Sequence, residues 1–344
     1  MSGHDLAATA QAIVAPGKGI LAADESTGTI EKRFAGIKVG NTEENRRAYR
    51  DLLFGAKGLA QHISGVILYD ETIRQKSANG TPFVELLARN GILPGIKVDT
   101  GAKDLALCPD EKVTEGLDNL GKRCAEYVKM GAKFAKWRAV ITIGAEMPSS
   151  TCIAANAHAL GRYAAICQAA GLVPIVEPEV LMDGEHTVER CEEVTEWTLN
   201  AVYEALYLNR VTLERSVLKP SMVIAGKNCA RQAGVEEVAE RTVRILKRTV
   251  PAAVAGIVFL SGGQSDEVAT AHLNAMNQMF KDRLPWPLSF SYGRALQQPA
   301  LKAWKGAAAN VAAAQAALLH RARMNGLACL GRYSVDQEKQ ALAA

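Results

Sequence analysis

The chain has 344 residues, of which 48% are hydrophobic and 22% are charged, a composition typical of folded globular proteins. Its length suits one large domain or two ordinary ones, and either can bury a sizeable core. The 40 basic and 36 acidic side chains give a net charge of +4 without a basic stripe. This balance argues against nucleic-acid binding and slightly favours anionic small molecules as ligands.

The cysteines and the first residues bear on the compartment. The seven cysteines are scattered and include no Cys-x-x-Cys pair, so we expect neither a zinc site nor a redox dithiol. Such a set fits a reducing compartment, and we expect a cytoplasmic protein. The early segment SGHDLAATAQ has no basic region, and the apolar stretch after it is broken at Pro16 and Gly17. We therefore expect no signal peptide and no membrane-spanning segment.

Short apolar runs alternate with longer amphipathic segments along the chain. The runs are GILAAD (19–24), SGVILYD (64–70), GIKVD (95–99), KFAKWR (133–138), VPIVEPE (173–179), VLKPSMVI (217–224), GIVFLS (256–261) and PLSFSYG (287–293). Helical periodicity marks the segments between them, for example 41–62 and 186–208. The spacing from one run to the next is roughly thirty to forty-five residues, the length of a βαβ unit.

Eight strands that alternate with helices predict an α/β protein, a single-domain (β/α)8 TIM barrel over residues 1–344. A doubly wound open sheet is the alternative, but no Gly-x-Gly-x-x-Gly motif follows the first strand. We expect an N-terminal helical extension and an Ala-rich helix over 298–326, with Gly326 as its C-cap. The tail, about 334–344, is polar and then small, and is expected to be mobile.

Most of the eight runs end in charged or hydroxyl side chains. Period-two alternation places Lys136 with Arg138, and Glu177 with Glu179, on one face of each strand. The active site of a parallel barrel is built from the carboxyl ends of several strands. The sequence therefore predicts one site there, which includes Asp24, Lys97, Lys136, Arg138, Glu177, Glu179, Lys219, Ser261, Ser291 and Arg294.

Taken singly, these residues also have purely structural explanations. Lys219 could be a strand-end lysine that reaches water, and Asp24-Glu25-Ser26 could be only a helix N-cap. Lys97 could form an exposed pair with Asp99, and the two glutamates could be surface charges or salt-bridge partners. Their convergence at one end of one barrel is what favours a functional site.

Two loops have the features of a phosphate site. Ser261-Gly262-Gly263 follows the seventh strand and precedes a helix, where glycines let backbone N–H groups approach an anion. Ser291-Tyr292-Gly293-Arg294 follows the eighth strand. Two tight turns are the alternative explanation. Barrels frequently bind phosphate with the loops after strands seven and eight, and this location, together with Arg294, favours phosphate.

A lysine within an apolar run is a candidate nucleophile. Burial of Lys219 and a second cation, Lys136 from a strand two places away, both favour the neutral amine. Such an amine forms a Schiff base with a carbonyl, while carboxylates transfer the protons and the iminium withdraws electrons without a cofactor. The six histidines have no ligand spacing on one helix, so no metal is expected. The residues predict Schiff-base chemistry on a phosphorylated sugar.

Seven segments between about residues 5 and 335 carry most of these charged and glycine residues: GILAADESTGTIEKR, GIKVDTG, KFAKWRAVI, VPIVEPEVLMDG, LKPSMVIAG, FLSGGQS and FSYGRALQ. Together, and in this order, they resemble the motif set of the class I (Schiff-base) fructose-1,6-bisphosphate aldolases. The resemblance implies a (β/α)8 barrel, usually a homotetramer, that acts without metal or cofactor. It also implies reversible cleavage of fructose 1,6-bisphosphate to dihydroxyacetone phosphate and glyceraldehyde 3-phosphate, in glycolysis and gluconeogenesis.

The resemblance also implies roles for the charged residues. Lys219, in LKP, matches the Schiff-base lysine. Glu177, in EPE, matches the acid and base for carbinolamine formation and dehydration, and Glu179 is its neighbour in the site. Asp24, in AADES, matches the group that orders the carbinolamine and assists cleavage between C3 and C4. Lys136, in KWR, matches a lysine that stabilises charge near the C4 hydroxyl and near the Schiff base.

The remaining matches concern the phosphates of the substrate. The residues that match the C1-phosphate site are Ser261, Gly262, Ser291, Gly293 and Arg294. Lys32 and Arg33, in IEKR, match residues that reach the other phosphate, with Arg138 near them. Lys97, in GIKVD, matches a lysine that contacts substrate phosphate or hydroxyls. The resemblance thus implies a small sugar phosphate as the binding partner, and neither nucleic acid nor membrane.

The chain departs from the family at its C-terminus. Well-known members end in a flexible tail whose terminal tyrosine assists proton transfer to the enamine, whereas this chain ends QALAA. Its nearest tyrosine, Tyr333, stands before the tail and does not match. We hypothesise that Glu177 or a water in the site exchanges the C3 proton instead.

Two other functions stay open from the sequence. The same chemistry could prefer sedoheptulose 1,7-bisphosphate or fructose 1-phosphate, because loops set that preference. Alternatively, the barrel could be a binding or scaffold protein that has lost catalysis. The intact set of Lys219, Glu177, Asp24 and Lys136 argues against such a loss.

Overall fold

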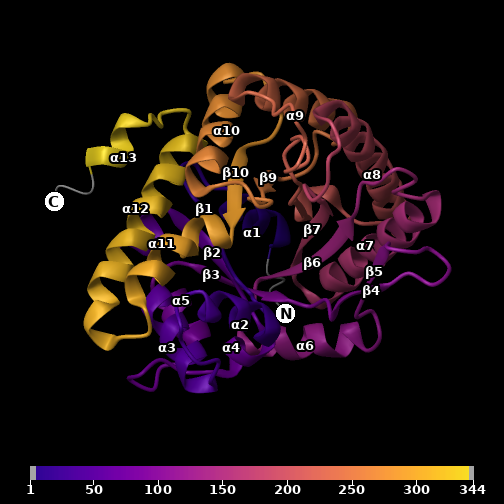
Figure 1. The fold of residues 1–344 in the computed structure, drawn as a ribbon. Helices are drawn as coiled ribbons and strands as arrows, with labels where there is room; N and C mark the ends of the chain where they lie inside the picture. Colours follow the sequence, from indigo (N-terminus) through magenta and orange to yellow (C-terminus); the bar gives the residue numbers. More distant parts are fainter. Residues whose placement is uncertain (1–4, 341–344) are drawn as a thin grey trace.

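The eight apolar runs form the strands of a closed parallel barrel in the computed structural model, which describes residues 5–340 (Figure 1). The strands are β1 (Gly19–Ala23), β2 (Ile63–Leu68), β3 (Leu93–Lys97), β6 (Phe134–Ile141), β7 (Val173–Val180), β8 (Val217–Leu218), β9 (Ile257–Phe259) and β10 (Leu288–Tyr292). Each strand pairs in parallel with its neighbours, and the pairing of β1 with β10 closes the ring. The predicted single-domain (β/α)8 barrel is confirmed.

Helices surround the barrel as an outer ring (Figure 1). They are α2 (Thr27–Ala35), α3 (Glu43–Phe54), α4 (Asp70–Arg74), α5 (Phe83–Arg89), α6 (Leu120–Met130), α7 (Ser150–Ala170), α8 (Val188–Leu208), α9 (Val235–Thr249), α10 (Asp266–Met279), α11 (Arg294–Trp304) and α12 (Val311–Cys329). Local sequence starts several of them: Thr42, Ser149, Thr187 and Ser265 each accept a hydrogen bond from the backbone N–H three residues later. Within residues 5–340, no helix is long and apolar enough to cross a bilayer.

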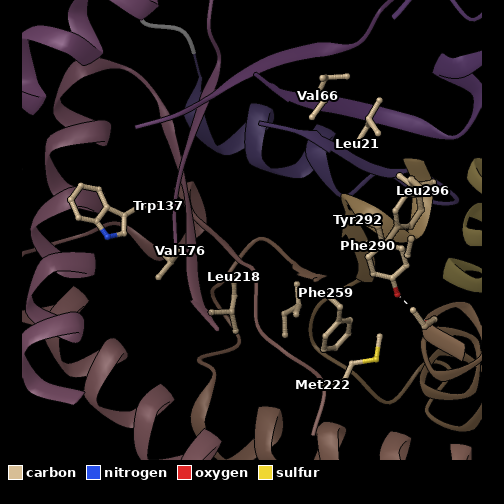
Figure 2. Close-up of a cluster of buried hydrophobic side chains, with 14 of the residues drawn as sticks. Leu21, Val66, Trp137, Val176, Leu218, Met222, Phe259, Phe290, Tyr292 and Leu296 are labelled. Atoms are coloured by element: carbon tan, nitrogen blue, oxygen red, sulfur yellow. Dashed lines mark hydrogen bonds between the residues drawn. The ribbon is translucent and has the colours of Figure 1, made fainter. Parts of the chain in front are cut away.

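Alternate strand residues pack into two different apolar clusters. The larger cluster lies between the strands and the helices, and Figure 2 shows part of it: Leu21, Val66, Trp137, Val176, Leu218, Phe259, Phe290 and Tyr292 from the strands, with Leu296 from α11. The smaller cluster combines α1 (Leu6–Ile13) with inward-facing residues such as Ile20, Ile175, Val217 and Val258. Period-two alternation along the strands separates the two sets. Helix α1 packs against the inward-facing set and so closes the amino-terminal end of the barrel.

Phe134 fills the barrel interior where two neighbouring strands carry glycine. A β-carbon on Gly95 would overlap the Phe134 ring, and a β-carbon on Gly65 would lie 3.0 Å from it. Phe134 itself is fully buried in the smaller cluster. The amino-terminal half of the barrel is therefore packed solid, and a ligand can enter only at the carboxyl ends of the strands.

Three boundaries differ from the sequence-based expectation. The strand expected over 217–224 ends at Leu218, because Pro220 has no N–H with which to continue the ladder. The helix expected over 298–326 is divided into α11 and α12 by Lys305 and Gly306, which have φ values of 50° and 77°. Gly326 is not the C-cap: it lies inside α12, where a β-carbon would come within 2.7 Å of the Gly17 carbonyl oxygen.

Two further segments complete the fold. An antiparallel hairpin of β4 (Gly101–Asp104) and β5 (Lys112–Glu115), which was not predicted from the sequence, follows β3. After Tyr333, the short helix α13 (Asp336–Gln340) packs back on α12 through Glu338, whose carboxylate lies 2.8 Å from His320 Nε2 and pairs with Arg321. Mobility of the tail stays a prediction, and its last residues, 341–344, lie outside the described part of the chain.

Candidate active site

One pocket of about 580 Å³ opens at the carboxyl ends of the strands. All of the candidate residues line it: Asp24, Lys32, Arg33, Lys97, Lys136, Arg138, Glu177, Glu179, Lys219, Ser261, Gly262, Ser291, Gly293 and Arg294. They come from β1, β3, β6, β7, β9, β10 and the segments that follow these strands, together with the residue after β8. Residues spread over most of the chain thus converge because the closed barrel brings its strand ends together.

The alternation along each strand explains why these side chains point into the pocket. On β6, Phe134 lies in the filled half of the barrel, and Lys136 and Arg138 line the pocket two and four residues later. On β7, Glu177 and Glu179 line it in the same way. Inward positions are therefore apolar near the amino ends of the strands and charged near the carboxyl ends.

Four buried charged groups form a continuous chain at the bottom of the pocket. Lys219 Nζ lies 3.1 Å from Glu177 Oε1, and Lys136 Nζ lies 3.2 Å from Glu177 Oε2. Lys136 Nζ also lies 2.7 Å from Asp24 Oδ2. All four side chains are at most 11% exposed. Two carboxylates thus balance two amines, and Glu177 lies between the two lysines.

Burial and ion pairing shift the pKa values in this cluster in opposite directions, and the ion pairs together have the larger effect. Burial alone would raise the pKa of the Asp24 carboxyl, but Lys136 and Lys219 hold the pKa well below its usual range. Burial alone would lower the pKa of Lys136, but Asp24 and Glu177 raise it above the ordinary lysine value. Asp24 is therefore ionised and Lys136 protonated at neutral pH.

Further charged side chains line the wall of the pocket. Arg138 Nε pairs with a carboxylate oxygen of Glu179, whose side chain is 12% exposed. Lys97 Nζ pairs with Asp99 Oδ1 and also donates to the Asp99 carbonyl oxygen at 2.9 Å. Asp99 Oδ2 accepts from the Arg138 backbone N–H at 3.2 Å. Asp99 thus joins the end of β3 to the middle of β6 and orients the Lys97 amine.

The loops after β9 and β10 lie on another side of the same pocket. Gly262 and Gly263 have φ values of 55° and 86°, a conformation that glycine adopts without strain. Helices α10 and α11 start beside these loops, and helix amino ends favour anions. Ser291 Oγ is buried and has no hydrogen-bond partner among the described residues. The pocket therefore offers a hydroxyl without a partner and two nearby helix amino ends, which suit a phosphate group.

Several residues of the pocket were not singled out in the sequence analysis. They are Ala22, Glu25, Ser26, Thr29, Gly36, Leu260 and Gln298, together with Gly263, which was named only as part of its loop. Ser26 Oγ and Thr29 Oγ1 lie 3.1 Å apart at the start of α2. The signal that could have found them is their position, since the segment after the first strand is one of the eight loops that build the site of a barrel.

Comparison with known proteins gives a consistent family. The family model described as fructose-bisphosphate aldolase class-I matches residues 5–344. A "probable fructose-bisphosphate aldolase class 1" of Xanthomonas campestris is 63% identical over 334 residues, which are 97% of this chain and 99% of the relative. "Fructose-bisphosphate aldolase 5, cytosolic" of Arabidopsis thaliana is 59% identical over 331 residues, 96% of this chain and 92% of the relative.

A solved structure shows the same architecture. It is a fructose-bisphosphate aldolase from Plasmodium falciparum in complex with TRAP and a small-molecule inhibitor. It is 53% identical, covers 96% of this chain and 95% of that one, and superposes with a TM-score of 0.94. The motif set, the barrel and these matches agree over nearly the whole length. The chain belongs to the class I fructose-bisphosphate aldolases.

Proposed function

We propose that Lys219 forms the Schiff base through which this aldolase reversibly cleaves fructose 1,6-bisphosphate. The products are dihydroxyacetone phosphate and glyceraldehyde 3-phosphate. The observation that carries the proposal is the contact between Lys219 Nζ and Glu177 Oε1, at 3.1 Å, in a pocket that the loops after β9 and β10 also line. The proposal assigns a nucleophile, a proton acceptor and hydrogen-bond donors to an anion to the lining of this one pocket.

Schiff-base formation uses Lys219 and Glu177. The neutral amine attacks the C2 carbonyl of the substrate, and Glu177 accepts the proton that the amine must lose. Glu177 passes this proton to the C2 oxygen, which gives the carbinolamine hydroxyl. Glu177 then takes up a second proton from water and donates it to this hydroxyl, which leaves as water while the nitrogen lone pair forms the iminium. Glu179 supports the site through its pair with Arg138.

Carbon–carbon cleavage uses Asp24 and Lys136. Glu177, which is a carboxylate again after dehydration, accepts the C4 hydroxyl proton. The bond between C3 and C4 then breaks, and the electron pair moves to the iminium nitrogen to give an enamine. Asp24 orders the intermediate and assists this step, and Lys136, at 2.7 Å from Asp24, stabilises the charge that develops near the C4 oxygen. Glyceraldehyde 3-phosphate leaves before the enamine is protonated.

The phosphates are held at two sides of the pocket. The C1 phosphate binds at the loops after β9 and β10, in a site made of Ser261, Gly262, Ser291, Gly293 and Arg294. Lys32, Arg33 and Arg138 reach the other phosphate, and Lys97 contacts phosphate or hydroxyl groups. Two anchored dianions fix the C2 carbonyl against Lys219, which lowers the entropic cost of the reaction.

Protonation of the enamine at C3 does not require a tyrosine in this proposal. Tyr333, the tyrosine nearest the tail, donates to Glu338 Oε1 at 2.9 Å and does not line the pocket. Glu177 or a water beside it supplies the proton, and hydrolysis of the resulting iminium releases dihydroxyacetone phosphate and the free lysine. The cycle therefore closes with side chains of the pocket.

We also propose an oligomeric state, a cellular compartment and the absence of a metal requirement for the enzyme. A homotetramer is supported by large exposed side chains such as Tyr207 and Leu208 at the end of α8, which are 81% and 70% exposed. Light scattering after size exclusion measures the subunit number. A cytoplasmic location is supported by relatives whose names call them cytosolic. We also expect full activity in EDTA, without metal or cofactor.

Borohydride trapping tests the covalent step. Wild type incubated with dihydroxyacetone phosphate and borohydride should lose activity irreversibly and gain one adduct, which peptide mapping should place on Lys219. Lys219→Ala should keep its fold and lose both adduct and cleavage. An adduct on another lysine, or retained turnover in the variant, would reject the assignment.

A further inference from the structure

A second buried charge cluster lies beside the catalytic one and is centred on Glu25. Arg50 Nη2 lies 2.8 Å from Glu25 Oε2, and Gln297 Nε2 donates to Glu25 Oε1 at 2.9 Å. Arg33 Nη1 also pairs with Glu25 Oε1. Gln297 Nε2 further donates to the Ala22 carbonyl oxygen at 2.7 Å. The Glu25 carboxylate thus has a partner on each oxygen from three different helices.

The members of this cluster differ in access to the pocket. Glu25 and Arg33 line the pocket, whereas Arg50 and Gln297 do not. The Arg50 side chain is 3% exposed, and that of Arg33 is 21% exposed. A β-carbon on Gly293 would lie 3.6 Å from Arg33 Nη2, so the guanidinium reaches across to the loop after β10. Arg33 is therefore the arginine of this cluster that can meet a ligand.

The charges do not cancel within the cluster. Burial alone would raise the pKa of the Glu25 carboxyl, but Arg33 and Arg50 lower it, so the carboxylate is ionised. One carboxylate against two guanidinium groups leaves a net positive charge, and its exposed part is the Arg33 end. Such an arrangement still attracts a phosphate dianion, while the carboxylate restrains a long side chain that would otherwise sample many rotamers.

We propose that Glu25 is a positioning residue: held by Arg50 and Gln297, it fixes the Arg33 guanidinium in place to bind a substrate phosphate. The inference rests on the proposed phosphate role of Arg33. It adds a supporting group that touches neither the reacting carbons nor the phosphate. The competing explanation is that Glu25 only neutralises the buried Arg50, in which case its loss should affect folding and not substrate binding.

A double-mutant cycle separates the two explanations. Glu25→Gln should raise KM for fructose 1,6-bisphosphate about tenfold and change kcat less than about threefold, because the lost restraint acts on binding. Arg33→Met should have a similar effect. The double variant should be no worse than Arg33→Met alone, since a positioning residue acts on the substrate only through Arg33.

A matched control exists between α8 and α9. Glu192 is also a largely buried carboxylate held by two arginines, at 2.6 Å from Arg241 Nη1 and paired with Arg244, but it does not line the pocket. Glu192→Gln should leave KM within about twofold of wild type. If Glu25→Gln does not fold, Gln297→Met removes one restraining donor without changing any charge, and should raise KM about threefold in the presence of Arg33 only.

Specific results would overturn the positioning role of Glu25. Effects of Glu25→Gln and Arg33→Met that multiply, or an unchanged KM with a lowered thermal midpoint, would overturn the positioning role. Borohydride trapping of the same preparations keeps this result apart from the reaction itself. Trapping on Lys219 in every variant at saturating substrate shows that the Schiff base stands, whereas a wild type that does not trap overturns the proposed function.

Discussion

Lys219 and Glu177 contact each other at 3.1 Å, and both side chains are at most 4% exposed. The second oxygen of Glu177 faces Lys136 at 3.2 Å, and Lys136 in turn holds Asp24. Because Glu177 lies between two amines, it can accept a proton from Lys219 while Lys136 remains protonated. Since these four groups are in direct contact, removal of any one of them should affect both stability and catalysis.

Lys136 should be the least replaceable of the groups that do not bond covalently to substrate. Lys136→Met leaves Asp24 and Glu177 buried without their shared cation, so the free energy of unfolding should fall by about 3 kcal/mol. The kcat for cleavage should fall at least about 100-fold, because charge near the C4 oxygen is no longer stabilised. Urea unfolding and steady-state kinetics measure the two effects. A kcat within tenfold of wild type would contradict the role.

Arg294 should act mainly in binding. Arg294→Ala removes a cation from the loop after β10, so KM for fructose 1,6-bisphosphate should rise more than about tenfold while kcat changes less. Lys302→Ala, on the exposed face of the same helix, is the matched control and should leave both constants unchanged. If kcat falls and KM does not change, Arg294 acts in the transition state instead.

Tyr333 should be dispensable for proton exchange at C3. Its hydroxyl donates to Glu338 at 2.9 Å outside the pocket, so Tyr333→Phe should exchange tritium at C3 of dihydroxyacetone phosphate within about twofold of wild type. Release of tritium to water, compared with the rate of cleavage, is the measurement. Loss of exchange with cleavage retained would show that the tyrosine reaches the site.

His272 gives stability a defined pH dependence. Its Nδ1 lies 2.6 Å from Oε1 of Gln264, a residue between β9 and α10, and burial lowers the pKa of His272 from 6.5 to about 4. The unfolded chain takes up this proton below pH 6.5 and the folded one does not until about pH 4. The stability contribution is therefore complete above pH 6.5 and is lost as the pH falls toward 4.

The measurement for His272 is urea unfolding at pH 7.5 and pH 5. His272→Gln should remove about 2 kcal/mol of the difference in free energy of unfolding between these two pH values. The exposed His158→Gln is the control and should leave the difference as in wild type. An equal pH difference in wild type and His272→Gln would contradict the assignment to this residue.

Much of the site follows from patterns that the chain carries locally. Inward strand positions change from apolar to charged in the order of the sequence, as in Phe134, Lys136 and Arg138, and this order already places the site at the carboxyl end of the barrel. Pro220 after Lys219 also ends the sixth strand at a position that can be read from the sequence. The longer strand predicted there is wrong because the apolar run continues past Pro220 while the ladder cannot.

Other features depend on distant neighbours and have no local signal. Glu25 lies next to Asp24 in the chain, yet its partners Arg50 and Gln297 are 25 and 272 residues away in sequence. Glycine often ends a helix, but Gly326 lies inside α12. A side chain does not fit there because Gly17 packs against it too closely. Partners of this kind are chosen by packing, which sums contacts over the whole fold.

The amino-acid sequence by itself determined the eight strands, the barrel, the Schiff-base lysine candidate and its companions, since strand period, turn residues and motif order are local and repeat along the chain. Only the tertiary structure decided which charges neutralise one another: Glu177 between Lys136 and Lys219, and Glu25 between Arg33 and Arg50. Electrostatic pairing depends on distance and burial in three dimensions, and neither quantity can be read from spacing along the chain.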